Sequence, residues 1–385
     1  MGWFRDGFAN VLISRTGGDT CNNRDLICRY KKNSMNVSDR PIEHGALQAF
    51  IARCFAACGL PADDAGKAAI LMARADLMGQ DGHGVFRLPQ YVRRIREGGL
   101  NVTPRLRTLE DRTSTALIDG DNGLGHLVMS HATELAMDKA ASSGVAWVGA
   151  RYSNHAGPAS LYAMMPLERD MIGIYVAVGS ANHLPPWGGT DMLLSTNPIA
   201  IAIPSANNPP IVLDMATTVA AYGKVKTAAQ RGEMMPEGWM IDREGRPLTD
   251  PNRAHEGFLL PIGGPKGYGL SLIFGILAGT LNGAAFGREV VDFNADSKTI
   301  TNTGHFVIAL DIKAFTDVDV FKSGIDEVWT QMKSSALLPG VNEIRLPGER
   351  LARVTAERSE KGIPLTSALR KQLAELAETL GVDPL

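Results

Sequence analysis

The chain has few cysteines and almost no net charge. Its 385 residues include four cysteines, which form no C-x-x-C pair, and eight histidines, which show no zinc-binding spacing such as H-E-x-x-H. The sequence therefore predicts no metal site. Lysine and arginine (39 residues) nearly balance aspartate and glutamate (41 residues), which leaves a net charge of -2. Because a basic surface dominates affinity for nucleic acids, this balance argues against a nucleic-acid partner and favours small metabolites.

The chain also lacks a convincing membrane-spanning segment. The residues between Lys266 and Arg288 are uncharged and could span a bilayer by length alone. Several glycines and Asn282 lower the hydrophobicity of this stretch, and no second candidate exists, so we expect a buried helix and no membrane association. Cys54 and Cys58 lie four residues apart in a helical pattern, where they fit as small apolar core residues of a protein in the reducing cytoplasm.

Three common catalytic and nucleotide-binding motifs are missing. No G-x-G-x-x-G occurs, and Gly120, Gly123 and Gly125 have the wrong spacing, which argues against a conventional Rossmann domain. Walker A is excluded, because Lys266 is followed by Gly267 and not by serine or threonine. No G-x-S-x-G elbow supports a serine hydrolase. A nucleotide would have to be bound in another way.

Residues 1–34 differ from the rest, since they show no helical or strand period and no apolar segment long enough for a secretory signal. We expect residues 1–38 to be a disordered tail or a mis-assigned start. Beyond them, helical patterns alternate with short apolar runs, which is typical of an α/β fold. The expected helices cover 39–58, 62–78, 127–143, 157–169, 217–231, 321–335, 349–360 and 366–380, and the expected strands cover 145–150, 171–178, 198–203, 210–213 and 305–312.

Lys266 is the only charged residue of segment 258–270, and four glycines, Gly264 and Gly267 among them, surround it. Glycine lets the backbone approach a ligand closely, and an isolated ammonium among exposed N–H groups suits an anion such as a phosphate. A tight turn with a solvated lysine is the alternative.

A second candidate cluster is D-G-H-G-V-F-R at 81–87, followed by Tyr91. If a helix begins there, Arg87 and Tyr91 share a face. The guanidinium of Arg87 offers parallel donors that match a carboxylate in a bidentate fashion. The alternative is a surface arginine beside a loop histidine, His83.

His155 follows the expected strand 145–150 and precedes an expected helix. Strand ends commonly carry ligand-binding groups in α/β proteins, and an imidazole titrates near neutral pH, as an acid/base catalyst should. A structural histidine is the alternative at this position.

The fourth candidate cluster is a set of loops from Ser180 to Thr218 at expected strand ends. Their short hydroxyl and carboxylate side chains can hydrogen-bond a ribose or an amide. Asp214 and Thr217 can instead cap the following helix, and capping is compatible with binding.

Taken in order, six segments resemble the type 2 malate/L-lactate dehydrogenase family, which includes sulfolactate and ureidoglycolate dehydrogenases and reductases of cyclic imines such as piperideine and pyrroline carboxylates. The resemblance covers roughly residues 40–360, and six ordered matches make it very specific. The segments are DGHGVFRLPQY (81–91), SNHAGPAS (153–160), PWGGTDMLLSTNPIAIAIP (186–204), LDMATTVAAYGKV (213–225), PEGWMIDREGRPLTDP (236–251) and LLPIGGPKGYGLSL (259–272).

The resemblance implies an α/β fold with a non-Rossmann, mixed-sheet NAD(P)-binding domain at 119–314. A mainly helical domain would be built from both chain ends, 39–118 and 315–385, and the protein would usually be a homodimer. The implied cofactor is NAD or NADP. The implied substrate is a small carboxylate, a 2-hydroxy or 2-oxo acid of the malate or lactate type.

Carried over by position, His155 resembles the family's acid/base, and Arg87 and His83 resemble contacts to the substrate carboxylate. Oxidation would send hydride from the substrate carbon to the nicotinamide while His155 takes the hydroxyl proton, and reduction would return both. The residues that resemble cofactor contacts are Ser180, Asp214, Met215, Ala216 and Lys266, with Gly264 and Gly267 beside Lys266.

Two positions depart from the family. Gly82 stands where a serine is usual, and the chain reads Ile273-Phe274-Gly275 where an acidic residue is common. Two alternatives therefore remain open, an NADPH-dependent reductase of cyclic imino acids and a catalytically weak homologue that binds nucleotide. The P-W-G-G segment favours the hydroxy-acid branch, and the retained His155, Arg87 and Lys266 argue against loss of activity.

Overall fold

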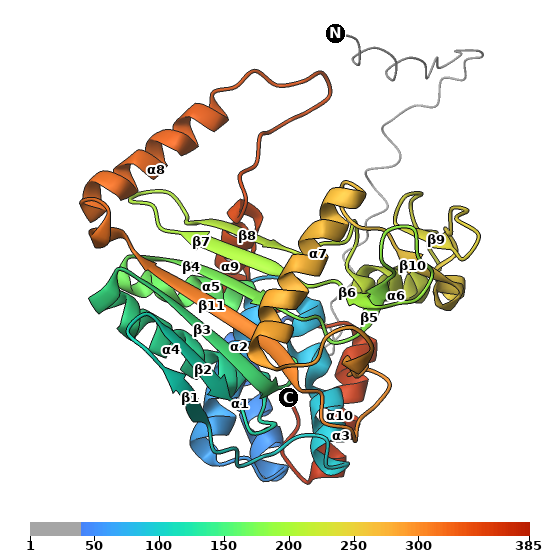
Figure 1. Ribbon diagram of the computed structural model, residues 1–385. Helices are drawn as coiled ribbons and strands as arrows, with labels where there is room; N and C mark the ends of the chain where they lie inside the picture. The colour runs from blue at the N-terminus through green and yellow to red at the C-terminus, as the bar shows by residue number, and fades with distance from the viewer. Residues whose placement is uncertain (1–39) are drawn as a thin grey trace, which may run out of the picture. The chain divides into compact units, whose positions relative to one another are not determined.

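The computed structural model describes residues 40–385, of which Pro41–Leu385 form one compact unit. The predicted extension, residues 1–38, lies outside the described part. A mixed sheet of seven strands runs through this unit in the order β1-β2-β3-β11-β4-β7-β8 (Figure 1). β2 and β3 are parallel, and the other neighbouring pairs are antiparallel. The strands are β1 (Arg107–Asp111), β2 (Thr115–Asp119), β3 (Val145–Ser153), β4 (Met171–Ala177), β7 (Ile199–Ile203), β8 (Ile211–Met215) and β11 (Thr303–Asp311).

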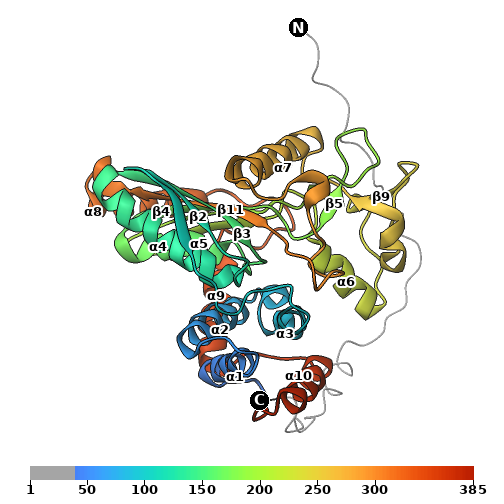
Figure 2. The ribbon, with the colours of Figure 1, turned by 60° about the horizontal axis from the view of Figure 1, so that its bottom comes forward.

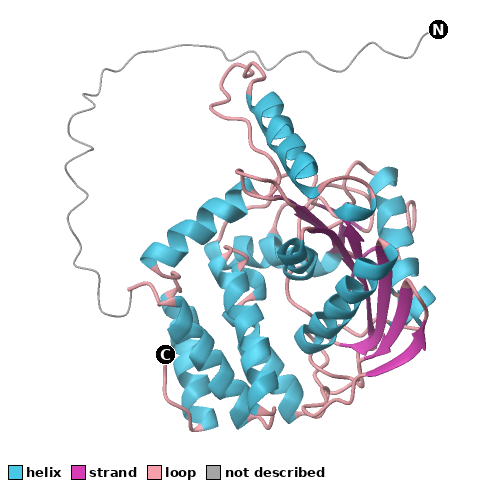
Figure 3. Ribbon diagram, turned by 90° about the vertical axis from the view of Figure 1, so that its left-hand side faces the viewer, coloured by secondary structure: helices cyan, strands magenta, loops and turns pink. Residues whose placement is uncertain are grey.

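Helices cover both faces of this sheet. The helices α4 (Gly125–Ser143) and α5 (Ser160–Met164) pack on one face, and α7 (Pro265–Ala278) packs on the other (Figures 2 and 3). Because side chains alternate along a strand, β3 sends Val148 into the core beneath α4 and Trp147 toward α7. Burial on both sides explains why the central strands read as continuous apolar runs.

The two ends of the described part of the chain form a separate helical layer below the sheet (Figure 2). Backbone hydrogen bonds of 2.8 and 2.7 Å between Ile42 and Ile363 join its first and last parts. Its core includes Cys54 and Leu373, and burial raises the pKa of the Cys54 thiol to about 12, so that this cysteine acts as a small apolar residue. The helices of this layer are α1 (His44–Ala57), α2 (Ala62–Leu77), α3 (Leu88–Arg96) and α10 (Ser367–Leu380).

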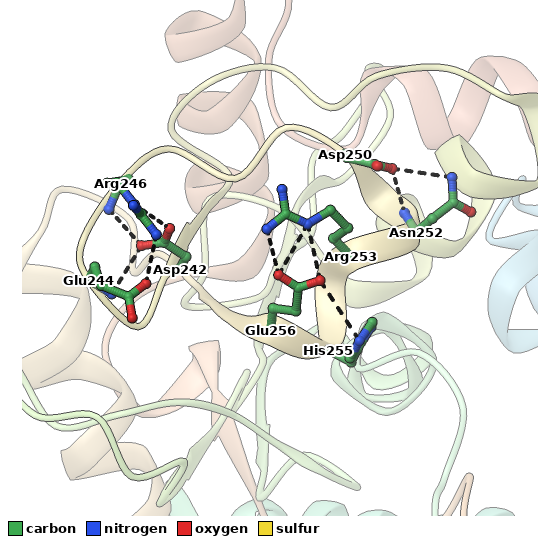
Figure 4. A network of polar contacts seen from close by, with 8 residues as sticks. All are labelled: Asp242, Glu244, Arg246, Asp250, Asn252, Arg253, His255 and Glu256. Atoms are coloured by element: carbon green, nitrogen blue, oxygen red, sulfur yellow. Dashed lines mark hydrogen bonds and ion pairs between the residues drawn. The ribbon is translucent and has the colours of Figure 1, made fainter.

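A smaller core lies beside the sheet, around Val225, Met240 and Leu259. Its elements are α6 (Tyr222–Arg231), β9 (Met240–Asp242) and β10 (Gly257–Leu259), and two further short strands, β5 (Asn182–Leu184) and β6 (Leu194–Ser195), pair with each other. The turn after β9 is closed by Asp242, which accepts the N–H of Arg246 at 2.9 Å and its Nε at 2.7 Å (Figure 4). The segment 236–251, one of the six that resemble the family, therefore has a structural role.

Two further helices complete the fold. α9 (Glu349–Lys361) lies against α2, whereas α8 (Val318–Lys333) extends away from the sheet (Figure 1). The uncharged stretch, residues 267–287, is divided between α7 and short turns. Within residues 40–385, no helix combines the length and the apolar character that crossing a membrane requires.

The predicted fold class is confirmed, and most predicted elements occur within a few residues of their expected bounds. Residues 107–118 differ, because they form β1 and most of β2 of the sheet although they fall in the segment 39–118 that was expected to belong to a mainly helical domain. The helix expected from residue 217 begins at Tyr222 instead. The preceding residues pair with another segment, since Val219 donates to Leu260 O at 2.8 Å.

Candidate active site

His155 lies in the turn that follows β3. The turn is held by the buried side chain of Asn154, whose amide donates to Asn122 O at 3.1 Å and to Gly123 O at 3.1 Å. Thr301 Oγ1 donates to Ser153 O at 2.8 Å and secures the end of the strand. The predicted location of His155, between a strand and a helix, is confirmed.

Aromatic rings surround the His155 imidazole. The rings of His83 and His155 stack with centroids 5.4 Å apart, and the Phe293 ring lies 5.3 Å from that of His155. Tyr91 Oη lies 2.5 Å from His155 Nδ1. Burial lowers the pKa of His155 well below its ordinary value, and the neighbouring His83 and Arg87 lower it further. The imidazole is therefore neutral at pH 7 in the ligand-free protein.

Arg87 lies beside this group, at the end of the short helix η4 (Val85–Arg87). Its Nε donates to Gly82 O at 2.9 Å, and its Nη1 donates to Gln90 Oε1 at 3.0 Å and to Asn294 Oδ1 at 2.8 Å. Within the described part of the chain, Nη2 has no hydrogen-bond partner. The guanidinium is thus oriented by three acceptors and keeps donors for a further anion.

His83 lies in the preceding short helix, η3 (Asp81–His83). Burial and the charge of Arg87 lower its pKa to about 4. His83 Nδ1 is buried and has no partner among residues 40–385. The three residues predicted to contact the reacting group, His155, Arg87 and His83, are therefore brought together by the fold.

Two of the predicted cofactor residues, Ser180 and Asp214, are hydrogen-bonded to residues near His155. Ser180 O accepts the N–H of Phe293 at 2.9 Å, which places Ser180 next to the ring that contacts His155. Asp214, near the end of β8, accepts from Gln80 Nε2 at 2.7 Å and from Ser160 N at 3.0 Å. Burial raises the pKa of this carboxyl, although both hydrogen bonds oppose the shift.

Neither Asp214 nor Thr217 caps the next helix. The N-cap of α6 is Ala221, and Thr217 Oγ1 donates to Thr196 O at 2.9 Å. The alternative that these side chains serve as helix caps is therefore wrong.

Lys266 is exposed in the first turn of α7, after Gly263 (φ +59°) and Gly264 (φ +64°). A Cβ at Gly267 would lie 2.1 Å from Ile262 O, so only glycine fits there. Ile262 N donates to Thr217 O at 3.0 Å, which brings this turn next to the segment that contains Met215 and Ala216. Across residues 40–385, no direct contact joins Lys266 to His155.

A cavity of about 280 Å³ opens beside Arg87, since Asn294, which binds the guanidinium, lines it. His183 and Tyr222 also line it and stack with centroids 4.2 Å apart. Asn182 Oδ1 is buried beside this cavity without a donor from the described residues. A second cavity, of about 330 Å³ between α2 and α9, contains none of the predicted site residues.

The sequence did not mark Phe293 and Asn294 as site residues, because their loop has no periodic pattern. Tyr91 carried a signal in its spacing from Arg87 but was not assigned a role. Within residues 40–385, no group of three or more potential metal ligands gathers.

The two departures from the family have different surroundings. A Cβ at Gly82 would meet open space, so the loop tolerates a side chain there. A Cβ at Gly275 would lie 2.2 Å from the ring of Phe286. The glycine at 275 is therefore required by packing.

The family model for malate/L-lactate dehydrogenase matches residues 42–374. The chain belongs to the malate/L-lactate dehydrogenase family. It is 39% identical over 364 residues to a malate dehydrogenase of Pyrococcus horikoshii, with 92% of this chain and 100% of the relative covered. The solved sulfolactate dehydrogenase of Methanocaldococcus jannaschii superposes with a TM-score of 0.83 at 36% identity and covers 89% of this chain and 98% of that one.

This family includes members with other specificities. A (2R)-3-sulfolactate dehydrogenase (NADP(+)) of Chromohalobacter salexigens is 33% identical, with 79% of this chain and 88% of the relative covered. The structure of the delta1-piperideine-2-carboxylate reductase of Pseudomonas syringae superposes with a TM-score of 0.77 at 30% identity and covers 88% of this chain and all of that one. The predicted family is confirmed, and the protein is an oxidoreductase.

Proposed function

We propose that this protein is an NAD- or NADP-dependent dehydrogenase of a small 2-hydroxy acid of the malate or lactate type. The observation that carries the proposal is the placement of an oriented guanidinium, Arg87, beside a buried neutral imidazole, His155. Arg87 binds the substrate carboxylate and holds the reacting carbon in register. His155 then exchanges the proton of the hydroxyl or carbonyl oxygen.

The chain offers a suitable environment for the dinucleotide. Lys266 and the glycines before it lie at the start of α7, where no side chain of the described residues caps the helix. Backbone N–H groups and the ammonium of Lys266 are therefore available together to bind an anion. The oxygen Asn182 Oδ1, which has no partner among the described residues, is available to accept a hydrogen bond from a ligand. The nicotinamide of a bound dinucleotide would supply or accept the hydride.

Tyr91 decides which nitrogen of His155 exchanges the proton. To act as a base at Nε2, the neutral imidazole must carry its proton on Nδ1 and donate it to Tyr91 Oη, 2.5 Å away, in place of the 3.4 Å hydrogen bond that Nδ1 accepts from Gly157 N. The hydroxyl can then donate to His155 O, at 3.3 Å. This arrangement also suits the imidazolium, so Tyr91 supports both protonation states that the reaction requires.

The Tyr91→Phe variant is expected to lower kcat by about tenfold to a hundredfold, because the proton then shifts between the two nitrogens without a fixed acceptor. Steady-state kinetics over pH 5 to 9 measure the effect. The Phe55→Leu variant, which alters a ring that contacts Tyr91 but carries no hydroxyl, is the packing control. An unchanged kcat and pH profile for Tyr91→Phe would show that the hydroxyl has no such role.

Substrate binding also tunes His155. Arg87 lowers the pKa of His155 through its positive charge, so a carboxylate bound to Arg87 cancels this effect and raises the pKa toward its ordinary value. A bound carboxylate thereby favours the protonated form of His155, which the reduction of a 2-oxo acid requires.

A reductase of cyclic imino acids is the second candidate. The same carboxylate clamp serves it, and the piperideine-2-carboxylate reductase has a similar fold. Proton transfer would then go to nitrogen. The weak-homologue alternative loses one of its two supports, since the glycine at 275 is explained by packing against Phe286.

We also propose that the protein is a cytoplasmic homodimer that associates through α7. The outward face of this helix exposes Leu270, Ile273 and Ile276, and Leu281 follows it. The helix carries no charged residue after Lys266, which favours a protein contact over a solvated face.

The Ile273→Glu variant is expected to shift the protein from dimer to monomer, since Ile273 is 52% exposed and a charge there would be buried in the contact. Light scattering after size exclusion measures the mass. Ile70→Glu places the same change on α2, at a site 47% exposed, and should leave the mass unchanged. A wild-type monomer at micromolar concentration would disprove the dimer.

The activity is tested by absorbance at 340 nm with NADH and NADPH in parallel. Oxaloacetate, pyruvate, other 2-oxo acids and piperideine-2-carboxylate serve as substrates. Turnover of a 2-oxo acid supports the dehydrogenase and identifies its cofactor, whereas turnover of the imine alone supports the second candidate. Cofactor binding without any turnover would favour the weak homologue.

A further inference from the structure

The segment that contains His83 and Arg87 is attached to a helix from the far end of the chain. Arg358, on α9, donates through Nη1 to Asp76 O and to Asp81 Oδ1, and through Nη2 to Asp81 Oδ2 at 3.2 Å. Asp81 is the first residue of η3, which ends at His83. One guanidinium thus joins the end of α2 to the start of the substrate-binding segment.

The second attachment lies within α2. The buried carboxyl group of Asp76, whose pKa burial raises to about 8, accepts the N–H of Val85 through Oδ2 at 2.7 Å. Val85 begins η4, which ends at Arg87. A Cβ at Gly84 would lie 2.2 Å from this carboxyl group, so Gly84 allows the segment to approach Asp76 closely.

α9 also packs directly against the turn after α2. Gly79 has φ +75°, and a Cβ there would lie 2.7 Å from Val354 Cγ1. Gly79 therefore allows α9 to approach the segment closely enough for Arg358 to reach Asp81. The side chain of Arg358 is only 14% exposed, whereas that of Asp81 is 60% exposed, so the arginine is the enclosed partner of this pair.

We infer that Arg358 is a positioning residue, which holds His83 and Arg87 in register with His155 through its bidentate pair with Asp81. This inference rests on the proposed function, since the position of Arg87 relative to His155 matters for the binding of a substrate carboxylate. The planar fork of arginine fixes both the distance and the orientation of the Asp81 carboxylate, which a lysine cannot do. Helix α9 thereby contributes to a site to which it supplies no contact of its own.

The kinetic test compares Arg358→Ala and Arg358→Lys with wild type. We expect Arg358→Ala to raise KM for the carboxylate substrate by about tenfold to a hundredfold, because small displacements of binding groups are costly. KM for the cofactor should stay within about twofold, which a general loss of structure would not allow. The KM of Arg358→Lys for the carboxylate substrate should lie between those of wild type and Arg358→Ala.

Arg353→Ala is the matched control, since Arg353 lies on the same helix and its nearest acid is Glu343 at 4.0 Å. It should leave both KM values unchanged. An unchanged carboxylate KM in Arg358→Ala, or equal changes in both KM values, would overturn the inference. If Arg358→Ala does not fold, Asp81→Asn removes the same charge pair from the exposed side and is expected to raise the carboxylate KM alike.

Hydrogen–deuterium exchange of the free protein separates this inference from the proposed function. Arg358→Ala should speed exchange in residues 81–91 and leave α4 unchanged. If exchange is faster but the protein turns over no carboxylate substrate, the proposed function is wrong, and the role of Arg358 in holding residues 81–91 is supported. Unchanged exchange in residues 81–91 would overturn the attachment whether or not the enzyme is active.

Discussion

The His155→Asn variant is expected to lose about two to four orders of magnitude in kcat, since this range is typical for the removal of a positioned acid/base group. Asparagine retains hydrogen bonding at this position but cannot exchange a proton near neutral pH. The surrounding stack of His83 and Phe293 does not depend on titration of His155, so the fold should persist. Single-turnover and steady-state rates at 340 nm measure the loss.

Binding of the cofactor separates catalysis from structure in this experiment. The dissociation constant for NADH or NADPH, measured by fluorescence, should change by less than about threefold, because His155 acts on the substrate oxygen. His131→Asn alters an exposed histidine of α4 and should leave kcat unchanged. Near wild-type rates in His155→Asn would remove His155 from the reaction.

Replacing Arg87 is expected to have the second largest effect. Arg87→Met should lower kcat/KM for carboxylate substrates by about two to three orders of magnitude, because the substrate carboxylate then loses a charge-assisted bidentate contact. Arg87→Lys should lower it less, since the charge stays but the fork is lost. The acceptors Gln90 and Asn294 would also lose their donor, so the measured loss includes their reorganisation.

An uncharged substrate analogue isolates the carboxylate contact. With the amide of the 2-oxo acid, wild type and Arg87→Met should turn over at similar rates, because neither makes the ionic contact. Arg93→Met is the matched control, since Arg93 is half exposed on α3 and its ion-pair partner among residues 40–385 is Glu97, at 3.8 Å. Equal losses for the acid and the amide would show that Arg87 does not bind the carboxylate.

The same variant changes the pH dependence. Burial lowers the pKa of His155, and the charge of Arg87 lowers it further, so Arg87→Met should raise this pKa. Oxidation requires the neutral imidazole, and its rate falls when the pH drops below the pKa. The acidic limb of kcat/KM for oxidation should therefore move to higher pH in Arg87→Met than in wild type.

Much of the fold was predictable, because local periodicity reports burial on one or two faces. The continuous apolar run at 145–150 indicated a central strand, and β3 covers it. β1 was missed because all five of its residues are exposed at the sheet edge, so no apolar pattern marks it. The early start expected for α6 failed because residues 217–219 pair with 260–262, a contact that local sequence does not encode.

The sequence by itself determined the family, the α/β class and the identity of the groups that we propose to act, since His155, Arg87 and Lys266 lie in motifs with fixed spacing. Only the tertiary structure decided how these groups are held. Phe293 reaches His155 from a loop without periodicity, and Arg358 meets Asp81 across 277 positions of the chain. Motif spacing reports contacts between neighbours along the chain, whereas pKa shifts and side-chain orientation depend on burial between distant segments, which only the packed molecule defines.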